Sequence, residues 1–278
     1  MPRSITFEQP NDTCMFTPLQ LQTTWIFRLG MTAWARWLAA HVASFPSLVR
    51  DHAFGAVVIG AYAYYRKPAG FFDSDGVRVT GGVTVVKQRS LLRIDIGVFA
   101  VGGAADGEKI ADSTGVMRAL RLAGDPGLGA TPIGVPPEVA AKFQPDEIDD
   151  AALAPRPVSE VLARIEGAPA IAEGSHRMTC SRALSEVADQ WSFVEAPHYS
   201  SWGREALVLS AGSKAPEIRR GLRQPVREVL VEYRKPAFAF DELEVRTRAI
   251  AHGDELVFVH AVNGANNGDQ RAVIVERF

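Results

Sequence analysis

One fifteen-residue segment occurs twice in this chain, and it constrains the fold more than any other feature. Residues 65–79 and residues 233–247 both begin Tyr-Arg-Lys-Pro-Ala, and nine of the fifteen aligned positions are identical at an offset of 168 residues. The same offset aligns Trp34 with Trp202. The chain is therefore predicted to be a tandem of two related modules. Two repeats are fewer than the three or more that a stacked solenoid needs, so we expect a pseudo-symmetric pair.

The composition is that of a globular protein with enough residues for two domains. The 278 residues are 47% hydrophobic and 22% charged, which provides material for a sizeable core. Thirty basic and thirty-two acidic side chains leave a net charge of −2. That balance gives no electrostatic footprint for nucleic acid or for an anionic membrane. We therefore expect neither as a partner.

Targeting and redox signals favour a cytoplasmic protein. The longest nearly apolar run, 54–65, is shorter than the roughly 20 residues needed to span a bilayer. Residues 1–5 lack the apolar stretch of a signal peptide. The two cysteines, Cys14 and Cys180, have no metal-ligand spacing, so we expect reduced thiols and no metal site.

The first module is predicted to contain one long helix followed by a sheet. Apolar residues at helical spacing predict the helix from about Thr17 to Val42. Residues 56–65 are rich in β-branched and aromatic side chains, which is typical of a buried strand. Further strands are predicted at 77–87, 91–101 and 109–120. A helix with an antiparallel meander is typical of an α+β module.

The composition changes after the first module, and then the same plan returns. Residues 123–170 are rich in proline, glycine and alanine, and we interpret them as a connection with short helices at 137–143 and 158–165. The second module is predicted to contain a strand at 176–180, a helical region at 184–209, and strands at 226–235, 243–252, 255–263 and 270–278. The predicted domains are thus 1–122 and 171–278, joined by 123–170.

The second module resembles a known superfamily. The segments that carry the resemblance are 231–236, 240–246 and 255–259. Together they are similar to the C-terminal half of a hotdog-fold module of the thioesterase and dehydratase superfamily. The resemblance implies a double hotdog, in which two tandem modules each wrap a curved antiparallel sheet around a long central helix. Residues 25–30, with Gly60 to Ala63 further on, also resemble the double-hotdog acyltransferase/decarboxylases of polyketide biosynthesis.

The resemblance implies an enzyme that acts on an acyl thioester, either acyl-CoA or an acyl-carrier protein. Thioesterase-like hydrolysis is the leading expectation, and acyl transfer with or without decarboxylation, or dehydration, is the alternative. A non-catalytic acyl-thioester-binding protein is a third reading. No separate cofactor is expected, because coenzyme A or phosphopantetheine is part of the substrate. The chain would act as a monomeric pseudo-dimer or as a homodimer.

Asp12 is the first catalytic candidate. The superfamily often places a catalytic carboxylate just before the central helix, in an Asp-x-x-Gly-His context. Here Asp12 is suitably placed, but Met15 and Phe16 occupy the Gly-His positions. Asp12 would activate water as a general base, or simply cap a helix. Cys180 occupies the matching position of the second module, so an acid would act in one module alone.

Tyr62 and His198 are the other catalytic candidates. The acyltransferase/decarboxylase resemblance implicates a tyrosine on the strand that carries Tyr62, and a phenol can accept an acyl group. The alternative is a core tyrosine with a satisfied hydroxyl. His198 precedes hydroxyl residues and would serve as an acid or base. It follows Pro197, so the alternative is a loop histidine at a helix kink.

The repeated basic pairs are candidates for substrate binding. They are Arg66 and Lys67 in the first copy, and Arg234 and Lys235 in the second. Their charges would suit the phosphates of coenzyme A or the acidic surface of a carrier protein. Basic residues at strand ends are also commonly solvated or structural, so both interpretations stay open.

Overall fold

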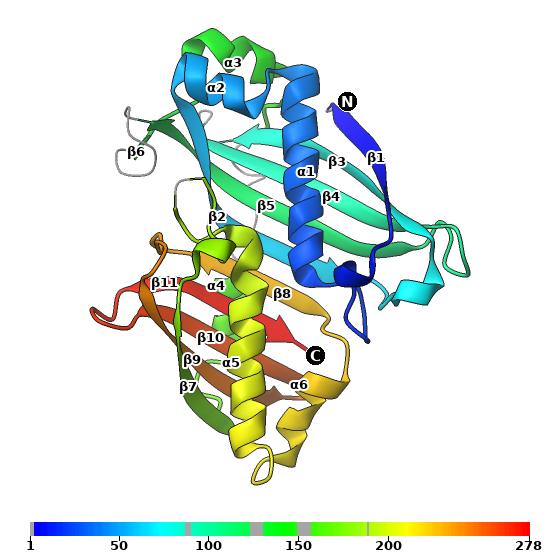
Figure 1. Ribbon diagram of the computed structural model, residues 1–278, viewed down its shortest axis with the longest axis vertical. Coiled ribbons are helices and arrows are strands. Elements are labelled where there is room, and N and C mark those ends of the chain that lie inside the picture. Colours follow the sequence, from blue (N-terminus) through cyan, green and yellow to red (C-terminus); the bar gives the residue numbers. More distant parts are fainter. Residues whose placement is uncertain (1–2, 87–89, 123–129, 149–156, 188) are drawn as a thin grey trace. The chain divides into compact units, whose positions relative to one another are not determined.

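The computed structural model describes residues 3–86, 90–122, 130–148, 157–187 and 189–278. It divides into two compact units, and each packs a long helix against an antiparallel sheet (Figure 1). The first unit comprises Met1–Ala61 with Ala69–Ala154, and the second comprises Tyr62–Pro68 with Pro155–Phe278. The predicted α+β class is confirmed.

The sheet of the first unit has strand order β1-β3-β4-β5-β2, with a short strand β6 paired to β5. The strands are β1 (Ser4–Pro10), β2 (Phe54–Tyr65), β3 (Gly76–Val86), β4 (Leu91–Val101), β5 (Lys109–Leu122) and β6 (Ala130–Pro132). β3, β4 and β5 form the predicted antiparallel meander. In β4, residues alternate between buried and half-buried, because successive side chains point to opposite faces of a strand.

The long helix α1 (Thr23–His41) contacts β1, β3, β4 and β5 (Figure 1). It starts six residues later than the predicted Thr17. The reason is a local turn, in which the Thr17 hydroxyl accepts hydrogen bonds from the backbone N–H groups of Leu19 and Gln20. Side-chain bonds of this kind compete with helix formation.

The sequence prediction missed several elements of the first unit, and two of them are β1 and α2 (Phe45–His52). The edge strand β1 pairs antiparallel with β3. Helix α2 occupies the stretch predicted as a connection. Ser44 caps it through a bond from Ser47 N, and Pro46 lies in its first turn, where a proline costs no hydrogen bond.

The second unit repeats the topology of the first. Its strand order is β7-β9-β10-β11-β8, which corresponds to β1-β3-β4-β5-β2. The elements are β7 (Ala172–Thr179), α5 (Ala196–Ala211), α6 (Arg220–Arg223), β8 (Glu228–Tyr233), β9 (Glu242–His252), β10 (Glu255–Gly264) and β11 (Gln270–Arg277). α5 contacts β7, β9, β10 and β11 (Figure 1). A shared strand order is what an internal duplication predicts.

The predicted connection 123–170 is divided between the two units. α3 (Pro137–Phe143), where a short helix was predicted, belongs to the first unit, and α4 (Pro157–Arg164) belongs to the second. Residues 123–129 and 149–156 lie outside the described residues. Short 3₁₀ helices complete the fold: η1 (Thr13–Met15), η2 (Phe71–Asp73), η3 (Gln144–Asp146), η5 (Arg182–Leu184), η6 (Phe193–Glu195) and η7 (Pro216–Arg219).

The repeated segment has a structural role that is the same in both copies. Asp73 Oδ2 accepts a hydrogen bond of 2.7 Å from Gly70 N, and Asp241 Oδ2 accepts one of 3.0 Å from Phe238 N. Both bonds close the turn that follows Tyr-Arg-Lys-Pro-Ala. The turn chemistry therefore accounts for part of the retained identity.

Asp146 of η3 binds Arg3, the residue before β1. Its side chain is fully buried, and its carboxylate accepts bonds from Arg3 N (3.0 Å) and Arg3 Nε (2.9 Å). The Arg3 guanidinium also lies 5.1 Å from the centre of the Trp37 ring. The Trp37 ring in turn stacks on Phe143 of α3, at a centroid distance of 6.0 Å.

We expect Asp146→Ala to destabilise the protein by about 3 kcal/mol, because it removes a buried charged acceptor and leaves Arg3 without it. The free energy of unfolding is measured by denaturant titration followed by tryptophan fluorescence. Asp51→Ala is the control, since its ion pair with Arg50 is solvent-exposed and little change is expected. Equal effects of the two substitutions would show that the buried pair contributes no more to the free energy of unfolding than the exposed pair.

Candidate active site at the start of helix α5

The start of α5 brings a carboxylate and an imidazole together. η6 (Phe193–Glu195) runs directly into α5, and Pro197 lies in the first turn of the helix. Glu195 and His198 are three residues apart, so they lie on one side of the turn. Glu195 Oε2 is 3.1 Å from His198 Nδ1. The predicted alternative of a kink at Pro197 is wrong, because a proline is compatible with a helix start.

The two partners differ in exposure, and this difference matters for chemistry. The Glu195 side chain is 6% exposed, whereas that of His198 is 35% exposed. The contact joins Nδ1 to Glu195 Oε2 without the alignment of a hydrogen bond. A buried carboxylate beside a half-exposed imidazole is an arrangement suited to general-base catalysis.

A cluster of aromatic side chains lies beside His198. The Trp202 ring lies 6.0 Å from the His198 ring at an interplanar angle of 29°. Tyr199 meets Trp202 edge-on at 5.7 Å and meets Trp191 at 4.3 Å. Trp202 is 41% exposed. The imidazole therefore stands beside an accessible apolar surface, which suits an acyl substrate better than a strongly charged one.

Tyr233, the last residue of β8, holds the turn before the pair. Its hydroxyl donates a hydrogen bond of 2.7 Å to the carbonyl of Phe193. Burial raises the pKa of Tyr233 well above its ordinary value, and the nearby Tyr62 raises it further. Tyr233 thus stays protonated as a donor. Tyr62 is itself buried and belongs to the same unit as His198.

The remaining catalytic candidate, Asp12, lies in the first unit and caps η1. Its Oδ1 accepts a bond of 2.7 Å from Cys14 N, which is the role foreseen as the structural alternative. Cys180, at the matching position of the second unit, is fully buried beside the Tyr199 hydroxyl at 3.8 Å. Burial raises the pKa of this thiol. A catalytic role for Asp12 stays a prediction.

The repeated basic residues lie just after β2 and β8, on the surface or close to it. Arg234 pairs with Glu232 at 2.8 Å, and Lys235 pairs with Asp269 at 2.9 Å. Arg66 and Lys67 are exposed. These contacts give the second pair structural partners, and substrate binding by either pair stays a prediction.

A second polar cluster lies buried beneath α5. Glu276 on β11 accepts hydrogen bonds from Ser200 (2.9 Å) and from Arg204, both on α5. His260 is fully buried, with Nε2 3.3 Å from Glu276 and Nδ1 2.9 Å from the Thr247 hydroxyl. Each ring nitrogen of this buried histidine therefore has a polar partner.

Burial alone would raise the pKa of Glu276, but the charge of Arg204 and the bonds from His260 and Arg204 outweigh it. The pKa of this carboxyl is lowered from 4.5 to about 2. Because the pKa is depressed in the folded state, the carboxylate stabilises the protein above pH 4.5. This contribution is lost as the pH falls through about 2.

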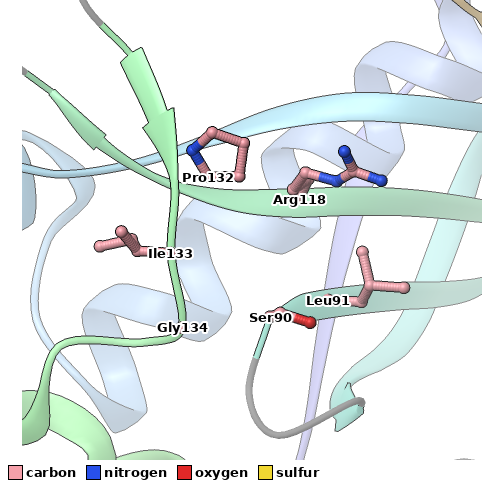
Figure 2. Close-up of a pocket in the computed structure, with 6 residues that line it drawn as sticks. All are labelled: Ser90, Leu91, Arg118, Pro132, Ile133 and Gly134. Carbon is pink, nitrogen blue, oxygen red and sulfur yellow. The ribbon is translucent and has the colours of Figure 1, made fainter.

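The pocket drawn in Figure 2 belongs to the first unit and offers different chemistry. Its volume is about 410 Å³. It is lined by Ser90, Leu91, Arg118, Pro132, Ile133 and Gly134. Among the described residues, the lining contains one basic group and one hydroxyl but no carboxylate or imidazole. Acid–base chemistry is therefore better placed at the start of α5.

The described residues offer neither a metal site nor a membrane span. No group of three or more His, Cys, Asp or Glu side chains there is arranged to hold a metal ion. No helix of the described chain is long and apolar enough to cross a membrane.

The fold is the hotdog fold, as the sequence resemblance implied, and solved structures of thioesterases share it. A protein assigned as an oleoyl thioesterase from Lactobacillus plantarum superposes with a TM-score of 0.75 at 11% identity, covering 99% of this chain and 96% of that one. The 12:0-ACP thioesterase from Umbellularia californica gives 0.69 at 12% identity, with coverages of 99% and 93%.

An acyl-ACP thioesterase from Bacteroides thetaiotaomicron gives a TM-score of 0.64 at 10% identity, covering 98% of this chain and 96% of that one. No protein-family model matches the sequence, and no curated protein matches it. At these identities the superpositions establish the fold.

We expect Glu276→Gln to lower the free energy of unfolding at neutral pH by about 3 kcal/mol, the equivalent of the pKa shift from 4.5 to about 2. The difference from the wild type should shrink as the pH is lowered from about 5 toward 2, where the native carboxyl becomes protonated as well. Denaturant titrations across this range measure it. Glu205→Gln, an exposed change on the same helix, is the control. A pH-independent difference for Glu276→Gln would contradict the expectation.

Proposed function

We propose that this protein is an acyl-thioester hydrolase of double-hotdog architecture whose active site lies at the start of α5. The observation that carries the proposal is the contact of 3.1 Å between buried Glu195 and half-exposed His198. The substrate would be an acyl-CoA or an acyl-carrier protein. Coenzyme A or phosphopantetheine would enter as part of the substrate.

The proposed reaction uses His198 as a general base. With the ring proton on Nδ1, beside Glu195 Oε2, Nε2 takes a proton from water as the water oxygen attacks the thioester carbonyl. The tetrahedral intermediate collapses, the carbon–sulfur bond breaks, and the imidazolium returns the proton to the departing thiolate. A carboxylic acid and a free thiol result. The positive end of the α5 dipole favours the negative charge that develops on the carbonyl oxygen.

The double-hotdog assignment is supported by two observations. Each unit packs one long helix on a five-strand antiparallel arrangement of the same order. The solved structures from Lactobacillus plantarum and Umbellularia californica superpose on 99% of this chain, so both units have counterparts in one polypeptide. The names of these proteins also support an acyl thioester as the substrate class.

We expect His198→Ala to lower kcat for acyl-CoA hydrolysis by at least about 100-fold, because it removes the base. Glu195→Gln should lower kcat about tenfold or more, because it removes the negative charge 3.1 Å from Nδ1, which stabilises the imidazolium that forms when His198 takes a proton. A panel of acyl-CoAs is assayed by release of free CoA, with protein mass followed in parallel. His252→Ala, an exposed histidine at the end of β9, is the control and should retain full activity.

The same assay distinguishes the other readings. Wild-type turnover that survives His198→Ala would refute the proposed site. A stable acyl adduct on Tyr62 would support acyl transfer instead. Tight acyl-CoA binding without CoA release, unchanged by either substitution, would indicate a non-catalytic binding protein.

A further inference from the structure

The carboxylate of Glu276 accepts hydrogen bonds from two successive turns of α5. One oxygen accepts a bond of 2.9 Å from the Ser200 hydroxyl, and the other accepts a bond from the Arg204 guanidinium. Ser200 and Arg204 are four residues apart, so they lie on the same helix face. The side chains of Glu276 and Arg204 are 3% and 13% exposed, so water competes little for these bonds. The attachment fixes both the rotation and the axial position of the helix.

Ser200 also connects this attachment to the turn that carries His198. Its hydroxyl oxygen is 3.1 Å from the carbonyl oxygen of Pro197, the residue before His198. The hydroxyl hydrogen therefore lies between two acceptors, Pro197 O and Glu276 Oε1. Any shift of the first turn would lengthen at least one of these contacts.

The close fit of α5 on the sheet leaves little freedom for such a shift. A Cβ atom at Gly203 would lie 2.6 Å from Thr247 Oγ1 and 3.3 Å from His260 Nδ1. The helix backbone thus rests directly on Thr247 and on His260, the histidine whose Nε2 contacts Glu276. On the other side of the pair, the Tyr233 hydroxyl fixes the carbonyl of Phe193. The segment that contains Glu195 and His198 is held at both ends.

We propose that Glu276 and Ser200 are positioning residues for His198: the buried carboxylate on β11 fixes, through the Ser200 hydroxyl, the first turn of α5 and so the place of the imidazole against Glu195. This inference rests on the proposed function. Neither residue touches the substrate. Their role is to keep Nε2 of His198 where the base must act, since small misplacements of a catalytic group are costly to rate.

The test is Ser200→Ala, which leaves Glu276 paired with Arg204 and His260 and is therefore expected to fold. We expect kcat to fall about tenfold with KM changed less than about twofold, because orientation is lost and binding is not. Ser210→Ala is the matched control. Its hydroxyl donates the same kind of bond, 3.1 Å to the Leu207 carbonyl, at the other end of the same helix.

A second measurement does not depend on activity. Amide hydrogen exchange of residues 198–201 should be faster in Ser200→Ala than in the wild type, and unchanged in Ser210→Ala. If the wild type hydrolyses thioesters and Ser200→Ala keeps its kcat, the positioning role is overturned. Equal losses in the Ser200 and Ser210 variants would also overturn it, since they would report helix stability alone. A wild type without hydrolase activity overturns the proposed function, and the exchange rates then still decide whether Ser200 holds the turn.

Discussion

One long helix packs against the sheet strands of each unit, and the candidate site depends on that packing. In the second unit the two ends of the helix meet the sheet differently. Toward its end, Leu207 and Val208 join a buried apolar cluster with Phe258 and Phe278. Toward its start, the contact is polar, through Glu276. Apolar contacts are non-directional, whereas a hydrogen-bonded carboxylate specifies distance and angle. The end of the helix that carries the candidate site is the end that is held directionally.

The two units differ in how the long helix contacts its surroundings at one aligned arginine. The offset of the internal repeat aligns Arg36 of α1 with Arg204 of α5. Arg204 meets a buried carboxylate, whereas the Arg36 guanidinium lies 4.6 Å from the centre of the Phe7 ring. The position before each long helix also differs between the units. Asp12 caps a 3₁₀ turn in the first unit, and Cys180 occupies the aligned position in the second. An internal duplication retains what both folds need, such as the turn closed by Asp73 and by Asp241, and leaves site residues free to differ.

The sequence predicted the parts of the fold that depend on local pattern. The strand at 91–101 was placed correctly, and the repeat anticipated the shared strand order. Element starts were less accurate, because Thr17 and Pro197 act through turn and cap geometry that hydrophobic spacing does not report. His198 was among the candidates, but Glu195 was not, although its spacing of three from His198 on a helix start was a readable signal. Glu276 could not be predicted as a partner of Ser200, because only the folded sheet brings residues 76 positions apart together.

The protonation states of the surrounding groups favour water as the nucleophile. Burial raises the pKa of the Cys180 thiol, and burial also raises the pKa values of the Tyr199 and Tyr233 phenols. At neutral pH these side chains are protonated and so are poor nucleophiles for a thioester, because the thiolate or phenolate is the reactive form. The His198 imidazole, beside Glu195 and partly exposed, can instead reach water. These protonation states fit the proposed hydrolysis by water better than a covalent acyl-enzyme route.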